Sequence, residues 1–349
     1  MNRAISISGR PIGPDHPPYI IAELSANHNG SLENAMAIVH AANDAGADAV
    51  KLQTYTPDTM TINHASEDFK IRGGLWDGYF LYDLYREAHM PWEWHEKLIK
   101  LGNELGLTVF STPFDESAVD LLDSLGVPAF KIASFEANDL PLIRYAASKG
   151  KPLIISTGMA RLGEIEDAVT AARQNGAPDI ILLHCVSAYP APAEESNLLN
   201  ISHLAETFDV VTGLSDHTLG TTVPSAAVAL GACLIEKHFT LRRSDGGPDS
   251  AFSLEPPELK QMVENTRVAW AARGHIDYQR TESERGSVIF RRSLYVVADV
   301  SAGEKFTTEN IRSIRPGYGL APKYAPDVIG RQATRDLRRG TPLDWMMVH

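Results

Sequence analysis

Two histidines end apolar runs at positions where they could bind one metal ion together. His217 follows the run VVTGLS, within GLSDHT, and His238 ends the run CLIEKH. Neutral imidazole is the commonest metal ligand in proteins, so two imidazoles at neighbouring strand ends predict a divalent-metal site. Glu23 ends the run YIIAE, which a closed sheet would place beside the last run. Its carboxylate could complete the coordination, act as a base, or form a buried structural ion pair.

Two lysines and several hydroxyl residues predict an anion site. Lys51 and Lys131 lie inside the runs AVKLQT and AFKIAS. A buried lysine is costly unless it is paired, so we expect both ammonium groups to point at an anion. Hydroxyl side chains at other run ends add hydrogen-bond donors: Ser134, Ser156, Thr157 and Ser215. Together they predict a phosphate or carboxylate site, with a Schiff-base lysine, as in aldolases, as the alternative.

Eight short apolar runs carry these residues. They end at Glu23, Thr54, Thr112, Ser134, Thr157, Cys185, Ser215 and His238. Segments of helical periodicity, such as 32–45 and 98–105, lie between them, and each of these two is followed by Gly. Alternating strands and helices predict parallel βαβ units. The active site of a (β/α)8 barrel is built from the C-terminal ends of its strands, so we predict an α/β protein with a TIM-barrel catalytic domain.

One connection between the runs is long and aromatic. It covers residues 55–94 and contains Phe69, Trp76, Tyr79, Phe80, Tyr82, Tyr85, Trp92 and Trp94. Packing among helices would explain these side chains. The competing interpretation is a lid that lines the pocket of a sugar or another organic substrate, because such a loop lies on the catalytic face.

Two further loops could serve either structure or chemistry. The segment SANHNGS (25–31) follows the first run and can cap a helix that begins near Leu32. Asp249 lies in GGPDSAFSL after the eighth run, where two glycines would let the loop fold over the site. A solvated carboxylate with no role in binding is an equal alternative for Asp249.

The sequence pattern changes near Gly274. The string GHIDYQRTESERG is polar and has no apolar stripe, which is typical of a linker. Beyond it the chain has short strand-like runs and turns. We therefore predict a barrel domain over 1–275, a linker over 276–288 and a small β-rich domain over 289–349.

Composition favours a cytoplasmic enzyme that acts on small molecules. The formal charge of −12 argues against a nucleic-acid partner, which needs a concentrated basic surface. No apolar run approaches the roughly 20 residues that span a bilayer, and MNRAISISGRPIG lacks the apolar core of a signal peptide. The two cysteines, Cys185 and Cys233, are expected to be reduced thiols in buried strands.

Several strings taken together resemble the sialic acid synthase family. They are IIAELSANHNGS, GADAVKLQTYTPD, STPFD, KIASFEAND, STGM, GLSDHT and EKHFT, in this order along the chain. The tail strings SLYVVADVSAGE and RPGYGL resemble the antifreeze-like (SAF) domain that ends those synthases. Within the family, EDFKIRGGLWDGYFLYDLYREAHMPWEWH and KIASFEAND are most similar to the pseudaminic acid synthase branch.

This resemblance implies a condensation of phosphoenolpyruvate (PEP) with an acylamino sugar, and it implies roles for named residues. His217 and His238 would bind the divalent metal, commonly manganese, with magnesium or cobalt also possible, and Glu23 would direct a water. The PEP-binding residues would be Lys51, Gln53, Thr112, Lys131, Ser134, Ser156 and Ser215. The sugar-binding residues would be Glu136, Tyr189, Asp249 and Arg315, the last reaching across a domain-swapped homodimer.

One departure from the family pattern bears on the sugar. Ser187 in HCVSAYP stands where N-acetylneuraminate synthases carry Asn. This fits a differently substituted 6-deoxy sugar, so we expect 2,4-diacetamido-2,4,6-trideoxy-L-altrose as the substrate. The alternative is an N-acetylneuraminate or legionaminic acid synthase that uses the same mechanism. A sugar-binding protein without catalysis would not need the set of polar strand ends.

Overall fold

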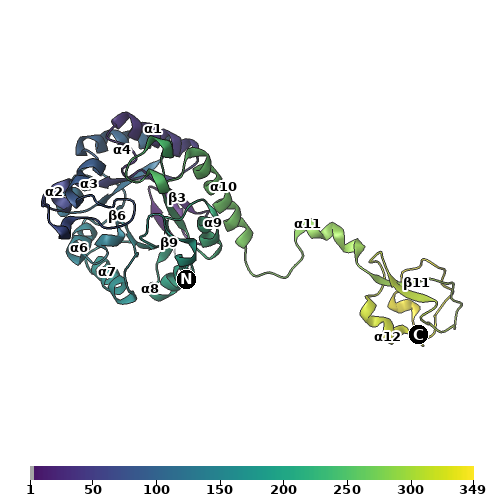
Figure 1. Ribbon diagram of the computed structural model, residues 1–349. Coiled ribbons are helices and arrows are strands. Elements are labelled where there is room, and N and C mark those ends of the chain that lie inside the picture. Colours follow the sequence, from purple (N-terminus) through teal and green to yellow (C-terminus); the bar gives the residue numbers. More distant parts are fainter. Residues whose placement is uncertain (1–3) are drawn as a thin grey trace. The chain divides into compact units, whose positions relative to one another are not determined.

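The computed structural model describes residues 4–349, which divide into two units (Figure 1). The first unit extends to Gly274 and the second runs from His275 to His349. The first has a ring of helices around a central set of strands, and the second is small and rich in turns.

The first unit is a closed barrel of eight parallel strands in the order β10-β3-β4-β5-β6-β7-β8-β9. These strands are β3 (Tyr19–Glu23), β4 (Ala49–Thr54), β5 (Thr108–Pro113), β6 (Phe130–Ile132), β7 (Leu153–Ser156), β8 (Ile180–Cys185), β9 (Val211–Asp216) and β10 (Leu234–His238). Nearly every strand residue is buried, because the outer faces are covered by helices and the inner faces by each other. The predicted TIM barrel is confirmed.

Helices connect the strands and cover the barrel. They are α1 (Leu32–Asp44), α4 (His95–Leu105), α5 (Glu116–Ser124), α6 (Leu140–Ser148), α7 (Leu162–Gln174), α8 (Asn200–Phe208), α9 (Thr222–Ala229) and α10 (Pro256–Arg273). The Ser31 hydroxyl accepts a hydrogen bond from the Asn34 amide at 3.2 Å and so caps α1. Helix α4 ends at Gly106, whose φ of 80° is the left-handed conformation that glycine adopts without a steric penalty.

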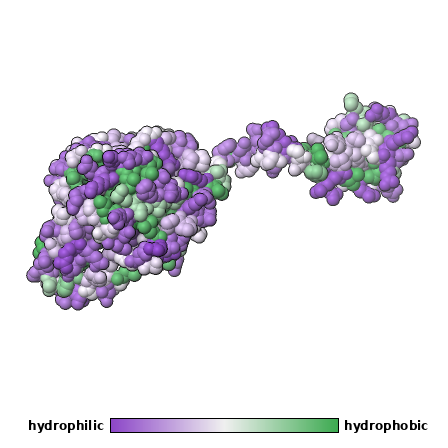
Figure 2. Space-filling view, turned by 90° about the horizontal axis from the view of Figure 1, so that it is seen from above, coloured by the Kyte–Doolittle hydropathy of each residue, from purple (hydrophilic) through white to green (hydrophobic). Residues whose placement is uncertain are grey.

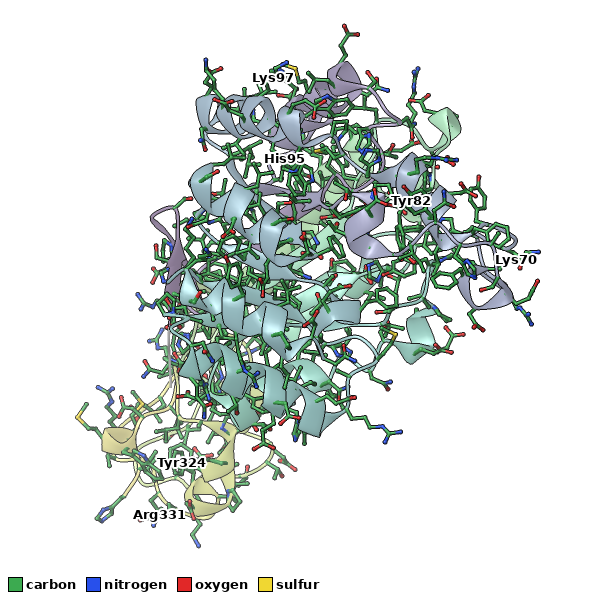
Figure 3. All side chains as sticks on the ribbon, turned by 90° about the vertical axis from the view of Figure 1, so that its left-hand side faces the viewer. Lys70, Tyr82, His95, Lys97, Tyr324 and Arg331 are labelled. Carbon is green, nitrogen blue, oxygen red and sulfur yellow. The ribbon has the colours of Figure 1, made fainter. Side chains whose placement is uncertain are left out.

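The aromatic connection between β4 and β5 contains α2 (Pro57–Met60), α3 (Leu81–Ala88) and the 3-10 turns Glu67–Phe69 and Trp92–Trp94. Lys70 of this segment lies at the edge of the unit, and His95 at the start of α4 is fully buried inside it (Figure 3). Other 3-10 turns follow barrel strands, at Ser134–Glu136, Ala193–Glu195, Arg243–Asp245 and Ser250–Phe252.

A β-hairpin that the sequence analysis did not predict precedes the barrel. It consists of β1 (Ile5–Ile7) and β2 (Arg10–Ile12). Ser8 and Gly9 form its turn with φ values of 50° and 78°, and such a turn matches the twist of the strands. Ile7 and Ile12 are fully buried in the barrel's hydrophobic core. The hairpin is therefore an integral part of the first unit.

The second unit begins with an exposed, mostly hydrophilic segment (Figure 2) that contains α11 (Glu282–Arg285) and the 3-10 turn Gly286–Phe290. The remainder pairs β11 (Ser293–Val296) with β12 (Ile311–Ile314), antiparallel, and adds α12 (Ala325–Val328) and 3-10 turns at Pro322–Tyr324 and Trp345–Met347. Its separate core includes Leu294, Phe306 and Val328. This small strand-rich region agrees with the predicted C-terminal domain.

Both cysteines are buried free thiols, as expected. Among residues 4–349, none of the helices combines the length and the apolar character needed to cross a membrane.

Gly213 in β9 provides a test of barrel packing. A methyl group there would lie 2.4 Å from the Leu234 carbonyl oxygen and 2.8 Å from Leu183 Cδ2. We expect Gly213→Ala to lower the free energy of unfolding by about 1–3 kcal/mol, measured by urea denaturation. Gly163→Ala in α7 is the matched control, because nothing lies within 4 Å of its added methyl group. The control should be neutral or stabilising by up to about 1 kcal/mol; equal losses in both variants would contradict this packing argument.

Candidate active site

Both lysines of the predicted anion site point into the barrel, where they share Glu236 of β10. Lys51 Nζ lies 3.0 Å from Glu236 Oε1 and 3.1 Å from Glu23 Oε2. Lys131 Nζ lies 3.8 Å from the same Glu236 oxygen and donates to Ser156 Oγ at 2.6 Å. Four charged side chains from four strands therefore form one buried cluster, which we call the lysine–glutamate cluster: Glu23, Lys51, Lys131 and Glu236.

Burial and the attraction between neighbouring charges shift the pKa values of the groups in this cluster. Burial raises the pKa of Glu23 above its ordinary value, and its ion pair with Lys51 only partly offsets this. Burial also lowers the pKa of Lys131, to about 8. For Glu236, burial opposes ionisation, but Lys131 and Lys51 outweigh it and hold the pKa below its usual range. The cluster thus combines a firmly ionised Glu236 with a Glu23 that is readily protonated.

Glu23 is connected to the loop after β10 through a chain of hydrogen bonds. Gln53 donates from Nε2 to Glu23 Oε1 at 2.9 Å and to Ser25 Oγ at 3.0 Å. The Ser25 hydroxyl donates to Asp249 Oδ2. Asp249 is therefore held against the barrel mouth rather than solvated, and burial raises the pKa of its carboxyl group. The structure therefore places Asp249 beside Ser25 and His238, and its part in sugar binding stays a prediction.

The two histidines lie together at the C-terminal ends of β9 and β10. Their ring centroids are 5.4 Å apart. Tyr189 packs on His217 at 4.4 Å, and Phe252 packs on His238 at 4.8 Å. Asp249 Oδ2 lies 4.0 Å from His238 Nδ1, which is buried and has no hydrogen-bond partner among the described residues. The pair therefore has an aromatic wall and an acidic neighbour.

The surroundings of the two imidazoles shift their pKa values in opposite directions. His217 Nδ1 lies 2.9 Å from the Val186 carbonyl oxygen, which places the proton on Nδ1 and leaves a lone pair on Nε2. Burial lowers the pKa of His238 well below its ordinary value, so this ring is neutral. Residues 4–349 contain no group of three or more His, Cys, Asp or Glu side chains placed to enclose an ion. Burial opposes the charged form of His217, but its interaction with Cys185 outweighs burial and raises the pKa of this ring. An ion held by the two rings would displace any proton from the free nitrogen of His217 and take its other ligands from substrate and water.

The predicted hydroxyl groups differ in their hydrogen-bond partners, and only some of them border the lysine–glutamate cluster. Ser215 donates to Glu236 Oε1 at 2.9 Å, so it and Ser156 border the lysine–glutamate cluster. Thr112 Oγ1 is buried and has no partner among the described residues. Ser134 Oγ instead accepts from the Gly158 amide at 3.1 Å. Thr157 departs from the expectation, because strand β7 ends at Ser156 and the Thr157 hydroxyl donates to the Leu183 carbonyl.

The remaining predicted residues lie at the barrel rim or in the second unit. Glu136 follows β6, and its buried Oε2 has no partner in the described part of the chain. Burial raises the pKa of this carboxyl group to about 7. Ser187 Oγ lies 3.9 Å from Cys185 Sγ, which is itself 3.8 Å from His217 Nδ1. Arg315 is exposed in the second unit, directly after β12.

The aromatic segment packs against neighbouring elements and also contacts residues beside the histidines. Tyr55 packs edge to face on Tyr85 of α3 and on Phe114, which is ordinary packing between neighbouring segments. Trp76 instead lies 5.5 Å from Tyr189, and its ring N–H donates to the Pro248 carbonyl in the loop after β10. The segment therefore reaches across the barrel mouth to the histidines.

Sequence reasoning missed Glu236, Ser25 and Phe252. Glu236 precedes His238 by two residues in a strand, and this alternation alone places both side chains on the same face. Ser25 was grouped with a capping segment, and only the fold brings it to Asp249. Phe252 carried no signal in the sequence, because a single aromatic residue in a loop is common.

Comparisons with known proteins show which family the chain belongs to. A model described as the NeuB family matches residues 38–278. The chain belongs to the NeuB family. A SAF domain model matches residues 291–349 of this NeuB-family chain. The resemblance to the sialic acid synthases is thereby confirmed.

Individual relatives cover nearly the whole NeuB-family chain. Pseudaminic acid synthase of Helicobacter pylori is 47% identical over 331 residues, 94% of this chain and 96% of the relative. Pseudaminic acid synthase of Campylobacter jejuni is 45% identical over 329 residues, with the same coverage. A crystal structure of N-acetylneuraminic acid synthetase from Leptospira borgpetersenii superposes with a TM-score of 0.74 and 33% identity, covering 82% of this chain and 96% of that one.

Proposed function

We propose that this chain is a pseudaminic acid synthase, a transferase that condenses PEP with 2,4-diacetamido-2,4,6-trideoxy-L-altrose. The observation that carries the proposal is the 47% identity to a pseudaminic acid synthase across 94% of the chain. The lysine–glutamate cluster and the two histidines supply chemistry that such a reaction requires. The products are pseudaminic acid and inorganic phosphate, and PEP loses phosphate by cleavage of its C–O bond.

The lysine–glutamate cluster would bind PEP. Lys51 and Lys131 carry two positive charges, and the hydroxyls of Ser156 and Ser215 lie beside them. When Glu23 is protonated, Glu236 alone opposes these two cations, so the cluster attracts an anion. Fixed charges in a dry interior stabilise phosphate and carboxylate groups without reorganisation. Gln53, Thr112 and Ser134 would complete the PEP site.

The histidine pair would serve the sugar. We propose that His217 and His238 hold a divalent ion, manganese by preference with magnesium or cobalt as alternatives. When bound, the ion supplies Lewis-acid polarisation of the aldehyde of the open-chain sugar. Glu136, Tyr189 and Asp249 would orient the sugar. Trp76 and Phe252 would exclude water from the aldehyde and provide apolar contacts for its methyl group.

The proposed reaction forms one bond and breaks another. Carbon 3 of PEP attacks the sugar aldehyde, and positive charge develops at carbon 2 of PEP. Water then adds to carbon 2, and the resulting tetrahedral intermediate expels phosphate. Glu23 would direct this water onto carbon 2, because Gln53 fixes the orientation of its carboxyl group. The proton that the water releases balances the alkoxide formed from the aldehyde oxygen. Holding both substrates in one pocket adds the advantage of proximity.

Phosphate release from PEP tests the proposal. With manganese present, we expect release with the diacetamido-trideoxy-altrose and none with N-acetylmannosamine or the legionaminic precursor. His238→Ala should lower turnover roughly 10³-fold or more, because the ion supplies several kcal/mol and each 1.4 kcal/mol is a factor of ten. His40→Ala on the exposed side of α1 is the matched control. Release with N-acetylmannosamine alone would reject the assigned sugar, and full activity after chelation would reject the metal.

We also propose that the active form is a domain-swapped homodimer in the cytoplasm, where PEP is made. Arg315 of one chain would complete the sugar site of the other. Mixing inactive Arg315→Ala and inactive His238→Ala chains should then restore activity, because each mixed dimer has one intact site. Random exchange at equal concentrations allows up to about a quarter of wild-type activity. No recovery, with subunit exchange verified by mass spectrometry, would favour a tail that serves its own barrel.

A further inference from the structure

A second buried ion pair lies on the outer wall of the barrel, directly behind the two histidines. Asp216 ends β9 and Lys237 lies in β10, and the two residues are register partners. The Lys237 ammonium group donates to Asp216 Oδ2, and their side chains are 0% and 2% exposed. The lysine–glutamate cluster lies on the opposite side of the same wall, because neighbouring strand residues alternate in direction.

Hydrogen bonds around this pair enclose His217 on both sides. Asp216 Oδ1 accepts from the Thr218 amide at 3.1 Å, and Asp216 Oδ2 accepts from the Thr218 hydroxyl at 3.0 Å. Lys237 also donates to the Thr218 carbonyl. The residues immediately before and after His217 are thus fastened to Lys237, whose neighbour in the chain is His238. The ammonium group of Lys237 therefore connects the two backbone segments that carry His217 and His238.

Packing alone does not require such a pair. Burying two charges has a desolvation cost that often equals or exceeds their attraction, and hydrophobic residues of similar volume commonly pack as stably. Directional bonds do what apolar contacts do not, because they fix the distance between the segment 216–218 and β10. Partners behind metal-binding histidines are known to control ligand orientation in proteins generally.

We propose that Asp216 and Lys237 are positioning residues that set the spacing of His217 and His238. They touch neither substrate, and they act through the backbones that carry the two rings. The inference rests on the proposed function, in which both imidazoles hold one ion. It extends that function by assigning the 5.4 Å ring separation to a contact outside the barrel.

The test uses the double variant Asp216→Asn/Lys237→Met, which removes the pair without leaving a single buried charge uncompensated. Val119→Ala in α5 is the matched control, because it creates a cavity in the buried helix layer, away from the histidines in sequence and in role. Urea denaturation of both variants shows that they fold and compares their losses of stability. Affinity for Mn²⁺ alone, measured by electron paramagnetic resonance, requires no turnover.

We expect the double variant to bind Mn²⁺ about 10–100-fold more weakly, the range seen when partners behind metal ligands are removed. Its KM for PEP should stay near the wild-type value while kcat falls, and Val119→Ala should change neither affinity nor kcat. Wild-type Mn²⁺ affinity in the double variant would overturn the inference. If the wild-type protein itself binds no Mn²⁺, the metal proposal fails. The positioning role is then tested by comparing the separation of the His217 and His238 rings in crystal structures of the wild-type protein and the double variant. A ring separation changed by the double variant supports the role, and an unchanged separation overturns it.

Discussion

The whole site depends on Glu236, a buried carboxylate between two buried lysines. Without it, two ammonium groups in the barrel interior would repel one another and lose their hydration. With it, Lys51 is paired at 3.0 Å and Lys131 is close enough at 3.8 Å to remain cationic over much of the neutral range. Because the pKa of Glu23 is raised by burial, the lysine–glutamate cluster can carry one more positive than negative charge. That excess makes the interior of an acidic protein attractive to an anion.

Strand register brings this charge cluster and the two histidines to the same end of the barrel. His238, Glu23 and Lys51 are partners across β10, β3 and β4, so they lie at one level of the wall. Strand alternation places Glu236 one layer deeper, beneath His238. An anion held between Lys51 and Lys131 would therefore lie beside the layer that carries the histidines. The loop with Asp249 and the segment with Trp76 close this arrangement from above, through Ser25 and Tyr189.

Much of this architecture could be predicted from the sequence, because strands buried on both faces form continuous apolar runs that end on polar residues. Four of the eight run ends coincide with the last residue of a strand, namely Glu23, Thr54, Cys185 and His238. Three more differ by one residue: Thr112, Thr157 and Ser215. Ser134 was placed at a strand end although β6 stops at Ile132, because a 3-10 turn begins there. Glu236 lies two residues before the end of its run, so the pattern of polar run ends does not indicate it. Its importance arises from lysines on other strands, which only the closed barrel brings together.

Calorimetric titration of PEP into Lys131→Met tests the central claim that the buried lysines form the PEP site. The variant keeps the shape of the side chain, and Glu236 retains Lys51 and Ser215 as partners. Lys149→Met, which removes a surface ion pair with Asp120, is the matched control. We predict at least about a tenfold loss of PEP affinity in Lys131→Met, because a hydrogen bond between charged groups contributes about 1.5–3 kcal/mol. PEP affinity equal to that of the wild-type protein and the control would contradict the account.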